Sequence, residues 1–213
     1  MRTKTAIPPH FSTFVRTDKP HISNSYLSTL KRALLGENQF YGSERFLHFG
    51  TEHHLRILEK NEAWTALQPD EEVTSANMKA VTDSDKKFQS ILRGARTEVE
   101  VQFIYRGVLV LMYVDILKSR KGWDYKTTKA KSEAEFIRKA READYWRQAA
   151  LYMAGTKRKD WEIVGQQKED PCGLFWLPIM DYPQYLAEGI DELNVLVDTH
   201  KELRKYYESR RPI

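Results

Sequence analysis

The chain has 213 residues, of which 41% are hydrophobic and 12% aromatic, enough to bury the core of one sizeable domain. Its 34 Lys and Arg residues against 30 Asp and Glu residues give a net charge of only +4, so overall charge does not argue for a polyanionic partner. A single cysteine, Cys172, excludes an internal disulfide framework and a multi-cysteine zinc or iron–sulfur site. Neither a secretory segment nor a run of about 18 apolar residues is present, so we expect a cytoplasmic protein that spans no membrane.

The first half of the chain reads as an arm followed by helices. Residues 1–20 mix prolines with basic and polar residues, so we expect a flexible basic arm, with residues 21–213 forming a single domain. Apolar spacing of i, i+3, i+4 predicts a helix that Ser23 or Asn24 caps and Gly36 ends. Further helices are expected over residues 44–60 and over roughly 70–94.

The pattern then changes to period two. Residues 98–105 alternate between apolar and polar side chains and predict a half-exposed strand, whereas residues 108–114 are apolar on both faces and predict a central strand. If Arg106 and Gly107 form a two-residue hairpin turn, the numbers of paired residues sum to 213. That register places Glu98 opposite Asp115 on one face.

The remaining elements alternate between strand and helix. A basic turn at 118–122 leads to a third strand, and a capping box at Ser132 opens helical sequence to about residue 154 with a kink near Ala143. Strands are expected over 161–167 and 174–180, before a final helix capped by Asp181. This order predicts an α/β fold with a mixed central sheet flanked by helices on both sides.

The chemistry centres on the second and third of these strands. Asp124 and Lys126, spaced i, i+2, project from one face of a strand, and Asp115 ends the preceding one. Two carboxylates and the backbone carbonyl of Tyr125 offer the hard oxygen ligands that Mg²⁺ or Mn²⁺ prefers. Lys126 beside such a metal would orient a water and balance charge at a phosphate, and whether it also takes a proton stays open.

These residues resemble a known family. Asp115 followed by Asp124-Tyr125-Lys126 is similar to the core of the PD-(D/E)XK nuclease superfamily, in which an Asp is followed, after a hairpin, by Asp/Glu-X-Lys. Gly50 to His54 resembles the helix from which RecB-type and RecE-type members supply a metal-binding histidine, and His54 matches best.

Further matches follow in the expected order. The stretch from Gln148 to Tyr152 resembles the Gln-X3-Tyr motif on the helix after the lysine strand, and residues 22–27 and 126–128 are similar to RecE-like, lambda-exonuclease-type enzymes of phages or bacteria. Together the matches span about residues 22–154.

The resemblance implies a restriction-endonuclease-like fold and a set of site residues. Asp115, Asp124 and Lys126 would be catalytic, and His54, the two aspartates and the Tyr125 carbonyl would bind Mg²⁺, for which Mn²⁺ could substitute. Gln148, Tyr152 and Lys129 would contact substrate. Glu98 and His53 are further candidates, and which of His53, His54 or Glu98 completes the metal shell stays open.

The implied activity is a DNA exonuclease that degrades duplex ends, 5′ to 3′, in recombination or repair within a bacterial or phage-infected cell. A ring-shaped homo-oligomer and a single-strand annealing protein as partner are further implications. Two alternatives stay open: a structure-specific or restriction-type endonuclease with the same metal centre, and a catalytically silent DNA-binding scaffold.

Overall fold

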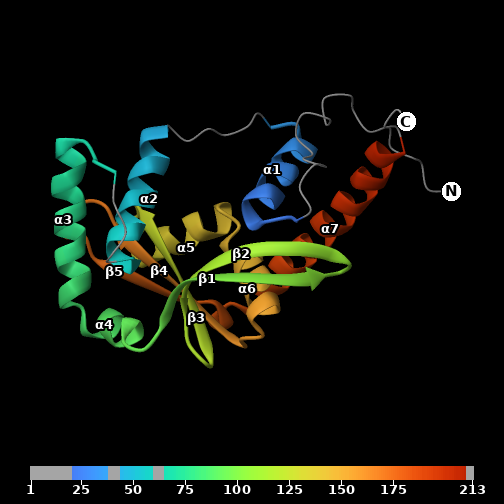
Figure 1. Ribbon diagram of the computed structural model, residues 1–213. Helices are drawn as coiled ribbons and strands as arrows, with labels where there is room; N and C mark the ends of the chain where they lie inside the picture. Colours follow the sequence, from blue (N-terminus) through green and yellow to red (C-terminus); the bar gives the residue numbers. More distant parts are fainter. Residues whose placement is uncertain (1–20, 38–43, 60–64, 210–213) are drawn as a thin grey trace.

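In a computed structural model, residues 21–37, 44–59 and 65–209 are described, so the expected arm over residues 1–20 lies outside the described chain. The first half contains α1 (Asn24–Leu35), α2 (Glu44–Leu58), α3 (Pro69–Ser84), α4 (Lys86–Leu92), β1 (Arg96–Tyr105), β2 (Val108–Leu117) and β3 (Lys121–Thr128) (Figure 1). The second half contains α5 (Glu133–Glu142), α6 (Tyr145–Thr156), β4 (Asp160–Gln167), β5 (Leu174–Pro178), a short 3-10 helix η2 (Ile179–Asp181) and α7 (Pro183–Glu208).

The strands form one mixed sheet in the order β1-β2-β3-β4-β5. Strands β3 and β4 run parallel because α5 and α6 carry the chain back between them, whereas the short connections elsewhere make the neighbouring strands antiparallel. Figure 1 shows α2, α3 and α4 grouped at one end of the molecule and α1 and α7 at the other. The expected α/β class with a mixed, helix-flanked sheet is confirmed.

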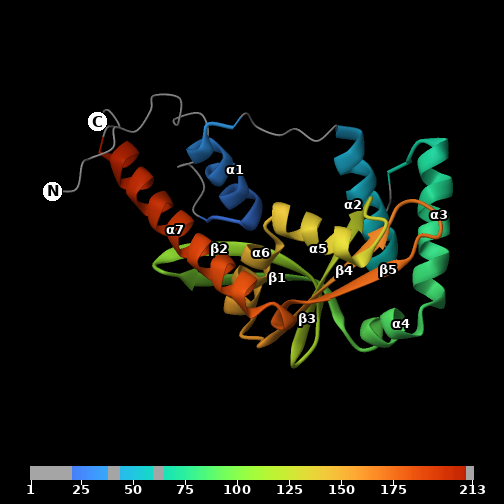
Figure 2. The same ribbon diagram turned by 180° about the vertical axis from the view of Figure 1, so that it is seen from behind.

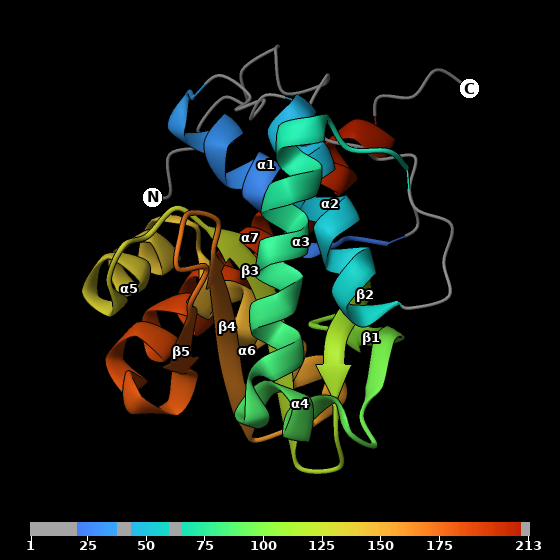
Figure 3. The same ribbon diagram turned by 90° about the vertical axis from the view of Figure 1, so that its left-hand side faces the viewer.

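Helices cover both faces of the sheet, and each face has its own apolar core. Val110, Met112 and Val114 of β2 pack in the core that α1, α5, α6 and α7 share. Ile116 and Tyr125 pack in a second core with residues of α2 and α4. Figure 3 shows α5 and α2 on opposite sides of β4, and α7 lies behind the β1–β2 hairpin in Figure 1 but in front of it in Figure 2.

The hairpin between β1 and β2 has the predicted turn and register. Arg106 and Gly107 have φ angles of 48° and 82°, the positive values that a two-residue type I′ turn requires. The paired residues include Tyr105 with Val108 and Val99 with Val114, so their numbers sum to 213 as predicted. The cap of α1 is also confirmed, since the Ser23 side chain accepts a hydrogen bond from the Tyr26 N–H.

Three expected helical features are corrected. The segment over 70–94 is two helices, because the side chain of Asp85 accepts the N–H of Phe88 and starts α4 anew. The predicted kink near Ala143 is a complete break between α5 and α6, at which Asp144 has a left-handed φ of 58°. Asp181 lies within η2 and does not cap α7, whose preceding residue is Tyr182.

The strand expected over 174–180 ends at Pro178, where η2 begins. None of the described helices combines the length and the apolar character needed to cross a membrane.

Candidate metal centre

Helix α2 brings His54 to the strand pair β1–β2. His54 Nε2 lies 2.6 Å from Glu98 Oε1 and 3.9 Å from Asp115 Oδ1. One ligand atom from each of these residues lies within 4.8 Å of the other two. We name His54, Glu98 and Asp115 the carboxylate–histidine cluster, and it joins three elements that are distant in sequence.

Glu98 reaches this cluster through an unusual backbone conformation. The ladder pairs Thr97 with Ile116 and Val99 with Val114, which leaves Glu98 opposite Asp115 as the sequence predicts. Glu98 itself has a left-handed φ of 48°. Such a conformation costs about 1 kcal/mol or more for a non-glycine residue and persists only where its surroundings impose it. Here it accompanies the short contact with His54.

Asp115 lies where β2 and β3 part. These strands pair at Ile116 with Trp123 and at Leu117 with Gly122. One residue further, Asp115 Oδ2 accepts a hydrogen bond of 2.7 Å from the Tyr125 N–H. The Asp115 carboxylate therefore accepts the N–H hydrogen bond that a backbone carbonyl would accept in a continuous ladder. Its other oxygen, Oδ1, is the one that faces His54.

Asp124 and Lys126 form a second group beside the cluster, on the side of α6. Lys126 Nζ lies 2.6 Å from Asp124 Oδ2, and the Gln148 amide donates a hydrogen bond of 3.0 Å to Asp124 Oδ1. Asp124 is 1% exposed, whereas 26% of the Lys126 side chain is exposed and within reach of water. The predicted i, i+2 pair therefore shares one face, and Gln148 fixes the carboxylate rather than the lysine.

Burial and mutual charge set the protonation of these groups. Burial raises the pKa of Asp124, and the charge of Asp115 raises it further, against the effect of Lys126. Burial would lower the pKa of Lys126, but the charges of Asp124 and Asp115 raise it, so Lys126 is an ammonium at neutral pH. Burial would likewise lower the pKa of His54, but its hydrogen bond to Glu98 and the charge of Asp115 raise it.

The donor set fits a divalent cation. Asp124 Oδ2 is buried without a hydrogen bond of suitable geometry, although Lys126 Nζ is close, so it has a lone pair to offer. Three carboxylates that repel one another are stabilised by a cation, and carboxylate oxygens are ligands that suit Mg²⁺ or Mn²⁺. His54, Glu98 and Asp115 are the residues that would hold the cation, and ligation by Asp124, which lies outside the carboxylate–histidine cluster, stays a prediction.

The other predicted site residues have different surroundings. Both ring nitrogens of His53 make hydrogen bonds elsewhere, to Ser75 on one side and to Tyr125 and Gln166 on the other. Burial lowers the pKa of His53 to about 4, so its ring is neutral. It lies outside the carboxylate–histidine cluster.

Tyr152 and Lys129 lie at different depths. Tyr152 is 8% exposed and packs edge-on against Trp161, with ring centroids 5.6 Å apart. Burial raises its pKa, and the charge of Asp124 raises it further. Lys129 is exposed one residue beyond the end of β3. Contact of either residue with substrate stays a prediction, as does ligation by the Tyr125 carbonyl.

Tyr145 is a residue that the sequence motif did not assign. It begins α6 and shares a helix face with Gln148 and Tyr152, at i, i+3 and i+7. Lys126 Nζ lies 5.8 Å from its ring centroid, a cation–π distance. The spacing of these three side chains was the signal available in the sequence, and it extends the Gln-X3-Tyr motif by one turn.

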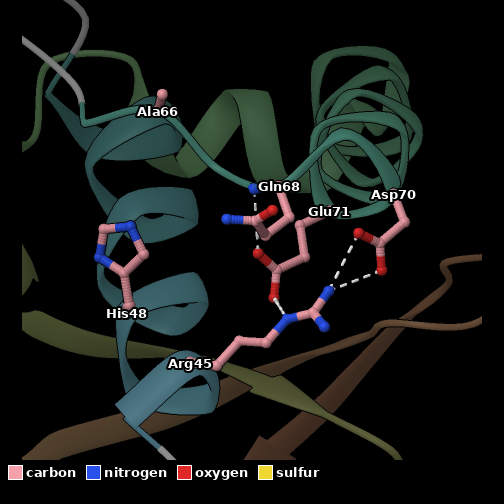
Figure 4. Close-up of a pocket in the computed structure, with 6 residues that line it drawn as sticks. All are labelled: Arg45, His48, Ala66, Gln68, Asp70 and Glu71. Atoms are coloured by element: carbon pink, nitrogen blue, oxygen red, sulfur yellow. Dashed lines mark hydrogen bonds and ion pairs between the residues drawn. The ribbon is translucent and has the colours of Figure 1, made fainter.

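A separate hollow lies between α2 and the start of α3 (Figure 4). Its volume is about 450 Å³, and its lining residues are Arg45, His48, Ala66, Gln68, Asp70 and Glu71. The Arg45 guanidinium lies 2.7 Å from Asp70 Oδ2, and its Nε lies 2.8 Å from Glu71 Oε1. Because two carboxylates already engage Arg45, this hollow is a poor site for a phosphate, and none of its lining residues belongs to the cluster.

The fold has counterparts among solved structures. A "Putative exonuclease" from Eubacterium rectale superposes with a TM-score of 0.64 at 14% sequence identity, covering 94% of this chain and 87% of that one. The two chains share one fold. The expected resemblance is confirmed at the level of the fold, which says nothing by itself about reaction or substrate.

Two further structures are more distant. An alkaline exonuclease from Laribacter hongkongensis has a TM-score of 0.48 at 14% identity, covering 93% of this chain and 97% of that one. A phage-related exonuclease from Haemophilus somnus has a TM-score of 0.41 at 14% identity, covering 83% and 84%. The sequence matches no protein-family model, and it matches no curated protein.

Proposed function

We propose that this protein is a metal-dependent DNA exonuclease that hydrolyses phosphodiester bonds at the ends of duplex DNA. The observation that carries the proposal is the carboxylate–histidine cluster beside the Asp124–Lys126 pair. The sequence resemblance supports the finer parts of the proposal: Mg²⁺ with Mn²⁺ as a substitute, 5′ to 3′ direction, a role in recombination or repair, a ring-shaped oligomer and an annealing partner.

The chain's own residues have distinct tasks in this reaction. His54, Glu98, Asp115 and Asp124 would hold the cation, which supplies Lewis acidity at a phosphoryl oxygen and lowers the pKa of a bound water. Lys126, held as an ammonium by its carboxylate neighbours, donates hydrogen bonds to the attacking water or to a phosphoryl oxygen and balances the developing negative charge.

The distinguishing experiment uses two DNA substrates with Mg²⁺ or Mn²⁺. We expect linear duplex labelled at one 5′ end to lose its label as small products, while covalently closed circular duplex stays intact. A 3′-end label would be released late if the direction is 5′ to 3′. Degradation of the closed circles would contradict an exonuclease and favour an endonuclease with the same centre.

Matched lysine variants test whether the centre is catalytic. Lys126→Ala should lower the rate by about 100-fold or more, because it removes a charged donor at the reacting phosphate. Lys121→Ala on the same strand removes a lysine that pairs with Asp160 and Glu162, and it should leave the rate near that of the wild type. Equal rates for both variants would contradict a catalytic role of Lys126. Binding of DNA without degradation by the wild type would favour a silent scaffold.

A further inference from the structure

A buried hydrogen-bond network lies directly behind the cluster and involves none of its members. Its centre is His53, which is 0% exposed and stacks on Phe49 with ring planes 6° apart. His53 Nδ1 lies 2.9 Å from Ser75 Oγ on α3, and Nε2 lies 3.0 Å from the Tyr125 hydroxyl and 3.1 Å from Gln166 Oε1. The network therefore joins α2, α3, β3 and β4.

The direction of each hydrogen bond follows from groups that can act in only one way. The Gln166 amide nitrogen donates to the backbone carbonyls of Met78 and Cys172, which turns its Oε1 toward His53 and Tyr125. Tyr125 has one hydroxyl proton, and it donates this proton to Gln166 Oε1. His53 Nε2 therefore cannot accept a hydrogen bond from the Tyr125 hydroxyl. It must instead carry a proton, which it donates to Gln166 Oε1.

The other side of the ring gives the same result. Arg56, which can only donate, lies 3.4 Å from Ser75 Oγ and forms two short hydrogen bonds with Glu72, at 2.6 and 2.7 Å. Ser75 Oγ can therefore accept from Arg56 and give its proton to His53 Nδ1. The two sides agree on a neutral ring that is protonated at Nε2.

Tyr125 connects this network to the cluster. Its hydroxyl lies in the network, its backbone N–H donates to Asp115 Oδ2 at 2.7 Å, and its ring packs edge-on to His54 with centroids 6.0 Å apart. His53 also precedes His54 on α2, so anchoring the one ring to β3 and β4 sets the rotation of the helix that presents the other.

We infer that His53 is a positioning residue for the metal centre: as its Nε2–H tautomer it holds Tyr125 and α2, and thereby Asp115 and His54, in the arrangement that binds the cation. This inference rests on the metal-binding part of the proposed function, because it needs the cluster to be a metal site. Groups that orient metal ligands in this way are typically worth 10- to 100-fold in metal affinity.

The test is Mn²⁺ binding by the full chain without DNA, measured by the loss of the free-ion electron paramagnetic resonance signal. His53→Leu should weaken Mn²⁺ binding by about 10-fold or more. His53→Gln keeps a donor near the position of Nε2 and should restore most of the affinity. His200→Leu removes another buried histidine, one that hydrogen-bonds Tyr26 at 2.8 Å between α1 and α7, and should leave Mn²⁺ affinity unchanged.

Two further measurements cover the case in which His53→Leu does not fold. Tyr125→Phe loses only the hydroxyl and should still weaken Mn²⁺ binding. Nitrogen-15 NMR of the histidine side chains should show His53 protonated at Nε2, with the signal identified by its loss in His53→Gln.

The outcomes separate this inference from the proposed function. Unchanged Mn²⁺ affinity in both His53→Leu and Tyr125→Phe would overturn the inference. A His53 ring protonated at Nδ1 would overturn it as well. Neither result would contradict the proposed nuclease activity. A wild type that binds Mn²⁺ in the predicted way but degrades no DNA would overturn the proposed function and leave the inference standing. A wild type that binds no Mn²⁺ would overturn both.

Discussion

Lys126 is a charged hydrogen-bond donor because of the residues around it. A lysine with this degree of burial would ordinarily lose its proton more easily, yet Asp124 and Asp115 reverse that tendency. Burial raises the pKa of Asp124, and the charge of Asp115 raises it further. At the scale of single residues, Asp115 and Asp124 are therefore two repelling carboxylates beside one ammonium, and a cation would relieve the remaining repulsion.

Tyr145 allows a test at this scale. Its ring lies over Lys126, and no hydrogen bond to its hydroxyl is found within the described parts of the chain. We expect the hydroxyl to donate to the DNA phosphate, so Tyr145→Phe should raise KM for DNA several-fold, with little change in kcat or in Mn²⁺ affinity. Steady-state kinetics on linear duplex measures this.

The matched control for Tyr145→Phe is Tyr105→Phe. The Tyr105 hydroxyl donates to Asn194 at 2.9 Å, between β1 and α7, so its loss costs a native hydrogen bond without touching the site. A KM for Tyr145→Phe equal to that of Tyr105→Phe would contradict a substrate contact.

At the scale of elements, α6 presents Gln148 and Tyr145 to the site, and α7 supports α6 from outside. The two helices approach closely at Gly189, where an added Cβ would lie 2.7 Å from the backbone N of Arg147 and the backbone C of Trp146. Backbone atoms in a helix cannot move aside as the end of a side chain can. Helix α6 can therefore pack this closely against α7 only because residue 189 is a glycine.

Two glycine variants should change stability in opposite directions. Gly189→Ala should lower the free energy of unfolding by about 1–3 kcal/mol because it overpacks the α6–α7 contact. Gly50→Ala lies in α2, where a Cβ would meet only Thr127 Oγ1 at 3.8 Å, and it should raise stability by up to about 1 kcal/mol through helix propensity. Urea unfolding measures both, and a stabilised Gly189→Ala protein would show that the helices are not in this contact.

At the scale of the whole molecule, the candidate metal centre joins segments that are far apart in the chain. His54 comes from α2, Glu98 from β1, Asp115 from β2 and Asp124 from β3. The unfolded chain does not hold these groups together, so the cation binds almost only to the folded state and stabilises it.

Mn²⁺ should accordingly raise the melting temperature. At about 100 times the Kd the gain is roughly 2.7 kcal/mol, which corresponds to about 5–10 °C for a chain of this size. Asp115→Asn should abolish the increase, yet in EDTA it should be as stable as the wild type or more so, because it removes one of the repelling carboxylates. Differential scanning calorimetry with and without Mn²⁺ measures this, and an equal shift in both proteins would place the cation elsewhere.

Local sequence determined the elements whose causes are local. The alternation over residues 98–105, the turn residues Arg106 and Gly107 and the cap at Ser23 act over a few neighbouring residues, so the hairpin, its register and α1 are predictable. The i, i+2 spacing of Asp124 and Lys126 likewise guarantees a shared face once the strand forms.

Tertiary structure decided which groups meet. His53 and His54 are neighbours about 100° apart on a helix, and only the packing of α2 against the sheet turns His54 to the carboxylates and His53 to Gln166. The left-handed turn at Glu98 and the contact of Tyr145 with Lys126 also depend on partners distant in sequence. Sequence patterns report which face of an element is apolar, whereas the rotation of that face against its neighbours is set by the packing of the whole core.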